Sequence, residues 1–162
     1  MSISKHVDAM EPADWHRVFG TNVFGACTAT TAVLPHLLES KGHAIYFGSE
    51  SAQHQPVPWR GIGGYIASKR ALDSIVRSFK LENPTVAFTN FIVGATMTEF
   101  GMDDGDQAVL EFAEEWFRIG HVSMTMLEPI DHAKVIVDIL NLPARVLIDQ
   151  VSVRARPLTT SA

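Results

Sequence analysis

Three short apolar runs alternate with longer segments of helical periodicity, and this alternation restricts the fold of the chain more than any other feature. The runs cover residues 43–48, 86–93 and 145–153. The first of them is short and apolar, as is typical of parallel strands that are buried on both faces of a sheet. Helices alternating with such strands predict an α/β fold, namely a Rossmann-like parallel sheet of about three strands with flanking helices.

The helical segments between these runs have recognisable ends. The first predicted helix begins at Pro12, is expected to kink at Pro35, and closes at Lys41-Gly42. The remaining predicted segments are helices at 65–80, 106–118 and 129–140, loops at 50–64 and 95–105, a loop or frayed end at 1–10, and a tail at 157–162. A chain of 162 residues without internal repeats predicts a single domain over 1–162.

The composition of the chain limits which partners it is expected to bind and in which cellular compartment it is expected to be. The formal net charge of −5 argues against a broad surface for nucleic acid or anionic membrane. No apolar run approaches the length of a membrane span, and residues 1–20 hold no apolar signal-peptide core. Cys27 is the only cysteine, which excludes an internal disulfide and fits a reducing compartment. A soluble, cytoplasmic protein is expected.

The seven histidines do not have the spacing of a zinc site, because they show neither an i, i+4 pair nor a Cys/His pattern. They are His6, His16, His36, His43, His54, His121 and His132. No metal site is predicted.

Tyr65 and Lys69 are the residues that most clearly suggest chemistry. If the segment from 65 onward is helical, residues four apart leave the same face. A phenol has an ordinary pKa of about 10, too high for ready proton exchange near neutrality, and an adjacent ammonium stabilises its anion. Ser49 follows the first apolar run, so its hydroxyl lies at the end of a predicted strand. These three residues predict a proton-transfer site for carbonyl or alcohol chemistry.

Four segments resemble the later motifs of the short-chain dehydrogenase/reductase family. They are Thr21-Asn22-Val23-Phe24-Gly25, Gly42 to Ser49, Tyr65 to Lys69, and Val93-Gly94-Ala95-Thr96-Met97-Thr98. The resemblance implies an NAD(P)-dependent oxidoreductase that interconverts a carbonyl and an alcohol of a small molecule by hydride transfer. The implied cofactor is NAD or NADP.

The resemblance also implies a role for each matching residue. Tyr65 would donate or accept the hydroxyl proton, and Ser49 would orient the carbonyl. Lys69 would lower the tyrosine pKa and hold the nicotinamide ribose, while Asn22 would order a water beside the lysine. The implied cofactor-binding residues are Tyr65, Lys69, Gly94, Thr96 and Thr98.

Two local departures from the family pattern affect these assignments. Val93 stands where the family usually has proline, so the loop after the second strand is expected to be less rigid. The interval from Ser49 to Tyr65 is a few residues longer than usual, which leaves Ser51 as a second candidate for the serine role. Ser49 is preferred because counting along the strand from Gly42 reaches it.

The family's glycine-rich pyrophosphate turn has no counterpart in this sequence. Gly61-Ile62-Gly63-Gly64 does not fit G-x-G-x-x-G, since Ile66 holds the last position. The chain therefore resembles the C-terminal part of a doubly wound fold, and an exposed apolar flank and edge are expected at its first strand. The alternative function is a truncated, catalytically inactive scaffold or dimerisation partner.

Two further hypotheses concern surfaces. Residues 96–120 are expected to form a substrate lid whose underside carries Phe100, Phe112, Trp116 and Phe117, unless these side chains pack on the sheet. Relatives pair through the equivalents of the helices at 12–40 and 65–80, which implies a homodimer or homotetramer. Small residues on these helices, such as Ala29 and Ala32, permit close approach.

Overall fold

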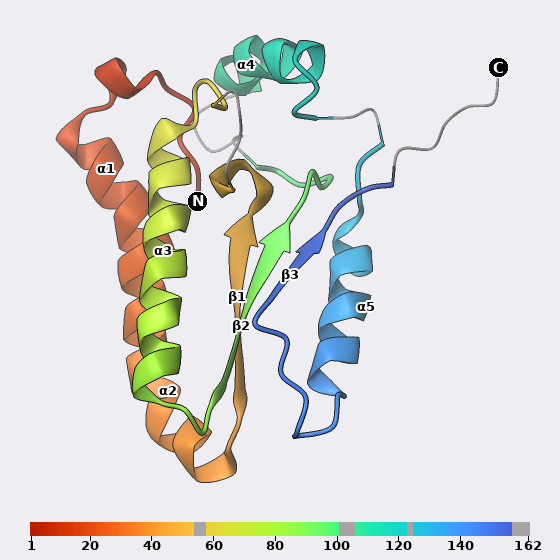
Figure 1. Cartoon of the computed structure of the whole chain (residues 1–162). Helices are drawn as coiled ribbons and strands as arrows, with labels where there is room; N and C mark the ends of the chain where they lie inside the picture. The colour runs from red at the N-terminus through yellow and green to blue at the C-terminus, as the bar shows by residue number, and fades with distance from the viewer. Residues whose placement is uncertain (54–57, 101–105, 123–124, 157–162) are drawn as a thin grey trace, which may run out of the picture.

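A three-stranded parallel sheet forms the centre of the molecule (Figure 1). The computed structural model describes residues 1–53, 58–100, 106–122 and 125–156, and the predicted tail lies outside these ranges. The strands are β1 (His43–Ser49), β2 (Ala87–Val93) and β3 (Gln150–Val153), in the order β1-β2-β3. This arrangement confirms the predicted α/β, Rossmann-like fold.

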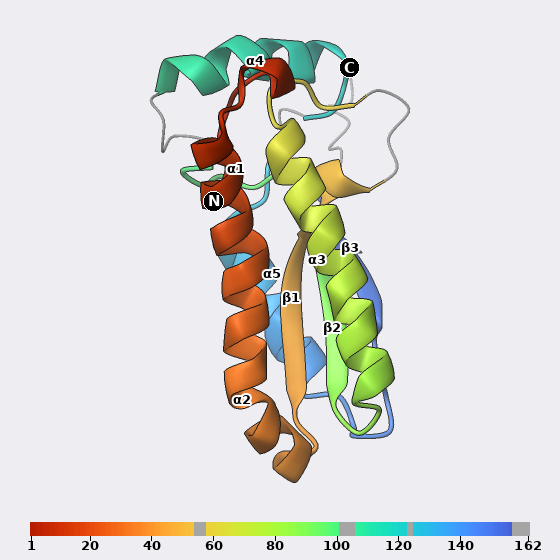
Figure 2. The same cartoon turned by 90° about the vertical axis from the view of Figure 1, so that its left-hand side faces the viewer.

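Helices lie on both faces of the sheet and across one of its ends. α2 (Ala26–Ser40) and α3 (Gly63–Glu82) cover one face, and α5 (Pro129–Leu140) covers the other (Figures 1 and 2). α4 (Asp106–Arg118) crosses the end at which the strands finish. The main core lies between the sheet and α3, and its buried residues are Tyr46, Leu72, Val76, Val86 and Phe88. None of the described helices is long and apolar enough to cross a membrane.

The segment predicted as one first helix consists of three consecutive helical elements. α1 (Pro12–Phe19) passes into a π-helical segment, η2 (Gly20–Gly25), which passes into α2. Pro12 starts α1 as predicted, and α2 ends at Lys41 in the left-handed conformation with φ 52°. The π-helical turn was not predicted, because one extra residue per turn barely changes the apolar periodicity. Such turns often occur at functional sites, and this one carries Asn22.

The third strand is shorter than predicted, since only residues 150–153 of the apolar run 145–153 pair with β2. The backbone N–H of Val146 donates to the carbonyl of Pro143 at 2.7 Å, so the run begins with a turn. Backbone-to-backbone bonding with β2 is present at Asp149, whose carbonyl accepts from the backbone N–H of Asn90 at 2.9 Å. The apolar pattern did not reveal this turn, because Val146 and the residue after it remain almost half exposed.

Residues 1–10 contain a short 3₁₀ helix, η1 (Val7–Ala9), and their first residues are not a frayed end. Ser2, Ile3 and Ser4 are buried, and Lys5 forms a parallel bridge with Ile62 just before α3. The backbone N–H of Lys5 donates to the carbonyl of residue 61 at 2.8 Å. The mixed, largely polar composition of residues 1–10 concealed this docking, in which the side chain of Ile3 is 1% exposed.

One edge of β1 is open within the described residues, because β1 is the outer strand of the sheet. The carbonyl of Gly42 accepts from Ala87 of β2, so alternate residues from Gly42 onward bond to β2. The backbone groups of His43, Ile45 and Phe47 therefore face the open edge. The Phe47 side chain is 50% exposed, which agrees with the apolar flank expected at this strand.

Candidate active site

Ser49, Tyr65 and Lys69 come together where β1 ends. Ser49 is the last residue of β1, while Tyr65 and Lys69 lie one turn apart near the start of α3. The side chains of Ser49 and Tyr65 share a hydrogen bond. The Lys69 ammonium lies 5.7 Å from the centre of the Tyr65 ring, and Ser49 and Lys69 line one small cavity of about 140 Å³. The structure thus assembles the three groups that the sequence singled out.

The Tyr65 phenol is held in its protonated form. Burial raises the pKa of Tyr65, and the hydrogen bond from Ser49 opposes this rise. Phe100 closes one side of the ring in an edge-to-face contact with 4.9 Å between ring centroids. The expected lowering of the tyrosine pKa by Lys69 is not what the structure shows, because the ammonium lies over the ring and not at the hydroxyl. A protonated phenol is the form that can donate to a carbonyl oxygen.

Lys69 has its own local partner at the edge of the sheet. Its ammonium donates to the carbonyl of Phe47 at 2.8 Å, on the open side of β1. Burial lowers the pKa of Lys69, because the charged form loses solvation. An ammonium carries three N–H donors, so the Phe47 carbonyl leaves donors for a further group.

Asn22 is placed against the first turns of α3. Its buried side-chain amide donates to the carbonyl of Met1 at 2.8 Å and to the hydroxyl of Ser68 at 2.9 Å. Ser68 in turn donates to the backbone carbonyl of Tyr65 at 2.7 Å. Asn22 therefore connects η2 with the turn that carries Tyr65 and Lys69, and it makes this connection through Ser68.

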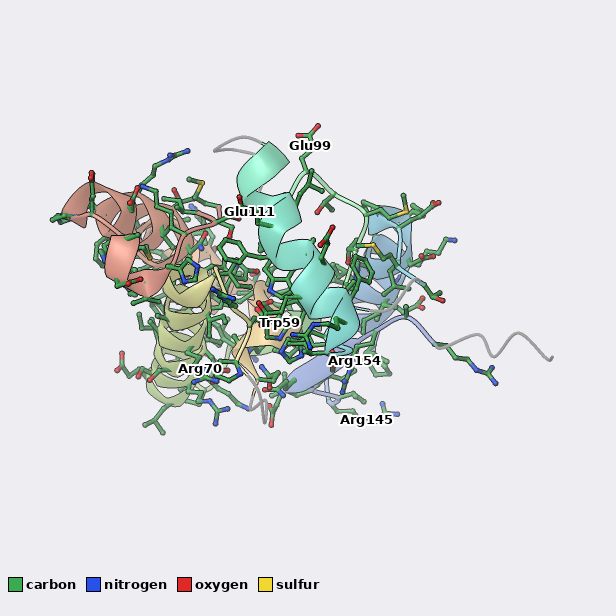
Figure 3. All side chains as sticks on the ribbon, turned by 90° about the horizontal axis from the view of Figure 1, so that it is seen from above. Trp59, Arg70, Glu99, Glu111, Arg145 and Arg154 are labelled. Carbon is green, nitrogen blue, oxygen red and sulfur yellow. The ribbon has the colours of Figure 1, made fainter. Side chains whose placement is uncertain are left out.

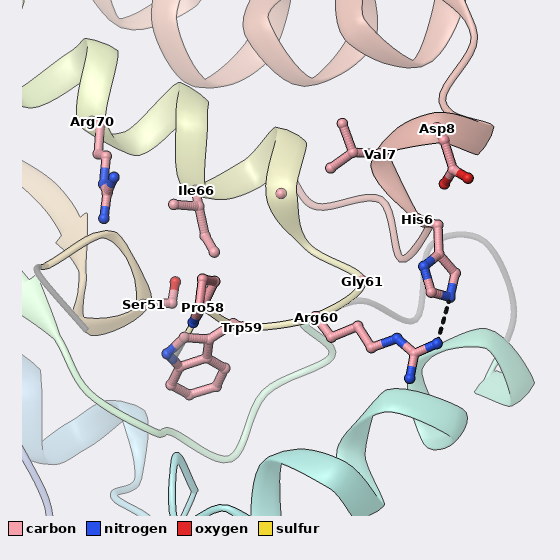
Figure 4. A pocket seen from close by; sticks show the side chains of 11 residues that line it. His6, Val7, Asp8, Ser51, Pro58, Trp59, Arg60, Gly61, Ile66 and Arg70 are labelled. Atoms are coloured by element: carbon pink, nitrogen blue, oxygen red, sulfur yellow. Dashed lines mark hydrogen bonds between the residues drawn. The ribbon is translucent and has the colours of Figure 1, made fainter. Parts of the chain in front are cut away.

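Ser51, the second candidate for the serine role, is buried beside Ser49. The two hydroxyl oxygens lie 2.9 Å apart, while the hydrogen bond to Tyr65 belongs to Ser49. Ser51 also lines a larger cavity of about 640 Å³ together with Trp59, Arg60 and other residues (Figure 4). A short hydrogen-bonded chain thus joins this cavity to the phenol.

The segment after β2 carries the predicted cofactor-binding residues Gly94, Thr96 and Thr98. A side chain at Gly94 would meet the backbone of the segment after β3, since a Cβ there would lie 2.7 Å from the Val153 carbonyl. Thr96 donates to the Gly94 carbonyl at 2.8 Å and also lies 2.8 Å from the ring nitrogen Nε2 of His132. Thr98 accepts from the backbone N–H of residue 100 at 3.3 Å. The three residues follow directly on the end of the strand beside β1.

α4 lies over this end of the sheet, with Trp59 beneath it in the view from above (Figure 3). Phe112 and Trp116 are buried in one cluster with Ile62 and Tyr65, so α4 packs on the start of α3 and not on the sheet. The fourth aromatic residue of the expected lid underside, Phe117, is 41% exposed and does not belong to it. Residues 101–105 and the side chains of 106–108, which also fall within the expected lid, lie outside the described parts.

The glycines just before and at the start of α3 serve packing. Gly61 has φ +81°, and a Cβ there would lie 2.3 Å from the Phe112 ring. A Cβ on Gly63 would lie 2.4 Å from Val7, and one on Gly64 would lie 2.5 Å from Met10. The turn lets both α4 and the N-terminal segment approach α3 closely, which supports the conclusion that it is no pyrophosphate loop.

A family model matches the part of the chain that contains this site. The model of the family described as short chain dehydrogenase matches residues 1–108, well over half of the 162 residues. The chain belongs to the short chain dehydrogenase family. The matched region of this short chain dehydrogenase includes all the residues assembled at the end of β1 and the segment after β2.

Individual relatives agree with the family assignment. An uncharacterized oxidoreductase of Mycobacterium tuberculosis is 31% identical over 146 residues, which are 88% of this chain and 55% of the relative. Sulfoacetaldehyde reductase 2 of Chromohalobacter salexigens is 31% identical over 147 residues, which are 87% of this chain and 54% of that protein. This short chain dehydrogenase thus spans about half the length of the curated relatives it matches.

A solved structure shows the same fold. The alcohol dehydrogenase of the archaeon Thermococcus sibiricus, complexed with 5-hydroxy-NADP, superposes with a TM-score of 0.77 at 25% identity. The superposition covers 98% of this chain and 62% of the archaeal one.

Two residues that the sequence did not assign to the site contribute to its geometry. Ser68 links Asn22 to Tyr65, and its signal was only that of a small residue between Tyr65 and Lys69. His132 contacts Thr96 from α5. Thr96 and His132 are 36 positions apart in the sequence, so no local pattern could have revealed this contact.

Proposed function

We propose that this short chain dehydrogenase is, alone or within a longer protein, an NAD(P)-dependent oxidoreductase that interconverts a carbonyl and an alcohol. The observation that supports this most directly is the hydrogen bond between Ser49 and Tyr65, with the Lys69 ammonium beside the same ring. Family membership and the reductase and dehydrogenase relatives support it as well.

The side chains divide the work of proton transfer and orientation. In the reducing direction the O–H bond of Tyr65 breaks, its proton passes to the carbonyl oxygen, and Ser49 holds that oxygen by hydrogen bonding. The raised pKa of Tyr65 suits this donation, because the phenol carries its proton at neutral pH. In the oxidising direction the deprotonated Tyr65 acts as the base, and the hydrogen bond from Ser49, which opposes the rise in the tyrosine pKa, stabilises the phenolate.

The donor set at the end of β1 fits a nicotinamide cofactor, NAD or NADP. When bound, the nicotinamide supplies or accepts the hydride. Lys69 retains N–H donors for ribose hydroxyls, since the Phe47 carbonyl occupies one of the three. We propose that Tyr65 and Lys69 hold the ribose side and that Gly94, Thr96 and Thr98 hold the nicotinamide side. Asn22 keeps the Tyr65–Lys69 turn in place through Ser68 and orders a water beside Lys69.

Replacing Tyr65 tests the catalytic assignment. In the active protein Tyr65→Phe is expected to abolish turnover and to leave cofactor affinity nearly unchanged, because only the transferable proton is lost. Tyr46→Phe is the matched control, since its buried hydroxyl bonds to Thr30 at 2.6 Å in the core. Both variants lose one buried phenol hydroxyl, yet only the first is expected to lose turnover. Wild-type-like activity in Tyr65→Phe would rule out the proposed role.

A second candidate is a catalytically inactive chain that serves as a scaffold or dimerisation partner. The open edge of β1 and the exposed Phe47 favour it, because these features suit association with another polypeptide. Titrating the 162-residue chain with NADH and NADPH separates the two candidates. Saturable binding in the micromolar range supports the enzyme, and no binding of either dinucleotide supports the inactive chain.

The remaining assignments belong to the same proposal. The substrate is a small carbonyl or alcohol, and residues 96–120 act as its lid through the contact of α4 with Tyr65.

The protein is a cytoplasmic homo-oligomer that pairs through the helices near 12–40 and 65–80. Exposed small residues on α2, among them Ala29 and Ala32, support this pairing.

A further inference from the structure

His132 and Thr96 form a buried contact between α5 and the segment after β2. The His132 side chain is 6% exposed, and its ring packs edge-on against Phe91 with 5.7 Å between centroids. Ring nitrogen Nε2 lies 2.8 Å from the Thr96 hydroxyl oxygen. The same hydroxyl lies 2.8 Å from the carbonyl oxygen of Gly94. Thr96 is therefore shared between one ring nitrogen and one carbonyl.

The chemistry of these groups fixes the direction of both hydrogen bonds. A carbonyl oxygen only accepts, so the single hydroxyl proton of Thr96 lies on the line to Gly94. Without that proton, two oxygens at 2.8 Å would repel each other. Nε2 of His132 must then be the donor, which makes the ring either an Nε2–H tautomer or a cation.

The other ring nitrogen selects the neutral form. Nδ1 of His132 is buried and has no hydrogen-bond partner among the described residues. An unpartnered lone pair there costs less than an unpartnered N–H of a cation, because a buried charge loses its solvation. The surroundings thus specify a neutral imidazole with its proton on Nε2.

We propose that His132, in this neutral form, is a positioning residue that fixes the segment after β2 against α5. The backbone of the same segment pairs with residue 127 just before α5. Met97 donates to the Leu127 carbonyl at 2.9 Å, and Leu127 donates to the Ala95 carbonyl at 3.0 Å. The imidazole adds a side-chain bond next to this backbone bridge. In one respect the inference rests on the proposed function, because the fixed segment carries residues proposed to hold the cofactor.

The contact is expected to open in acid. Phe91 from β2 and Thr96 from the segment after it contact the ring, and Asp131 from α5 itself acts on its charge. Asp131 is the acidic group among them, and its carboxylate already accepts from the backbone N–H of Glu128 at 3.0 Å. Burial lowers the pKa of His132 and outweighs the opposing charge of Asp131. A second proton on Nδ1 would find no acceptor, so protonation favours release of the ring.

Nuclear magnetic resonance of the ligand-free chain tests the inference. The ¹⁵N shifts of the His132 ring at pH 7.5 are expected to show the Nε2–H tautomer, and its titration is expected to lie below that of a free histidine. Amide hydrogen exchange at Met97 and Leu127, corrected for intrinsic pH dependence, reports the bridge. It is expected to accelerate as His132 becomes protonated.

Two substitutions at His132 separate its hydrogen bond from its bulk. His132→Gln places an amide donor near Nε2 and has no titration, so the protection of Met97 and Leu127 is expected to stay constant with pH. His132→Phe keeps a ring without a donor, and exchange at both amides is expected to be roughly five- to tenfold faster at every pH. His36→Gln, on the exposed face of α2, is the control and is expected to behave like the wild type.

An Nδ1–H tautomer in the wild-type chain would overturn the inference, as would unchanged exchange in His132→Phe. If neither variant folds, the tautomer and titration of the wild-type ring still decide the question. The measurements need neither cofactor nor turnover. Failure of the Tyr65 experiment therefore leaves this result standing, and a negative result here leaves the proposed chemistry standing.

Discussion

At the scale of single residues, two histidines make the same kind of contact near the two ends of β2. His43 approaches Thr89 at 2.7 Å, and the Thr89 hydroxyl donates to the carbonyl of Ile148 at 2.6 Å. The arrangement at His132, Thr96 and Gly94 is equivalent. In both, a threonine whose proton is committed to a carbonyl requires a donor imidazole. Burial lowers the pKa of both histidines, so each is more readily protonated in the unfolded chain.

This difference predicts how stability depends on pH. Above a pH of about 6.5, the ordinary histidine pKa, both rings are neutral in the folded and unfolded chain, so they add no pH dependence. Below it the unfolded chain binds more protons, and the free energy of unfolding falls until the folded-state pKa values are reached. Urea denaturation at pH 7.5 and pH 5 checks this. The double variant His43→Gln, His132→Gln is expected to lose less stability over that interval than the wild type, and an equal loss would contradict the prediction.

At the scale of elements, the turn before α3 decides where α4 lies. Gly61 adopts φ +81° and faces the Phe112 ring at a distance that leaves no room for a methyl group. Trp116 donates its indole N–H to the carbonyl of Arg60 at 2.9 Å, and the Arg60 guanidinium pairs with Glu115 at 3.2 Å. Apolar packing, one hydrogen bond and one ion pair thus hold α4 over Tyr65.

Two glycine substitutions measure the importance of this contact. Gly61→Ala is expected to destabilise the chain by roughly 2–4 kcal/mol, because left-handed strain adds to overpacking against Phe112. Gly120→Ala is the matched control: Gly120 has φ +76° but open space around its Cβ position, so only about 1–2 kcal/mol of strain is expected. Thermal unfolding gives both values, and tryptophan fluorescence reports Trp116. Equal losses in the two variants would show that Phe112 adjusts freely.

The elements differ in how well the sequence predicted them. α4 begins and ends at the predicted residues, since apolar periodicity marks an amphipathic helix clearly. The predicted third strand was longer than β3, because a turn within an apolar run leaves no trace in hydropathy.

At the site, the motif spacing correctly placed Ser49 and Tyr65 together. The position of the Lys69 ammonium depends on the open edge of β1, and a carbonyl direction cannot be read from residue types.

At the scale of the whole molecule, two apolar surfaces on opposite sides of the sheet remain exposed. On one side, η2 and α2 expose Phe24 and Val33 beside the small residues Ala29 and Ala32. On the other, α5 exposes Ile130, Val137 and Leu140, and the exposed Phe47 packs against Phe91 of β2. Both sides offer apolar area to a partner. They differ in shape, because small residues let two helices approach more closely than the large side chains of α5 do.

This difference predicts which surface makes the proposed homo-oligomer. Ala29→Arg places a long charged side chain where close helix packing is proposed, so it is expected to convert the oligomer to monomer in sedimentation velocity experiments. Val137→Arg adds the same charge at a 54% exposed position of α5 and is expected to leave the oligomer intact. Both variants change the net charge equally, so a general charge effect would act on both. A monomeric Val137→Arg with an oligomeric Ala29→Arg would move the interface to the α5 side of the sheet, where Phe47 and the open edge of β1 would then belong to it.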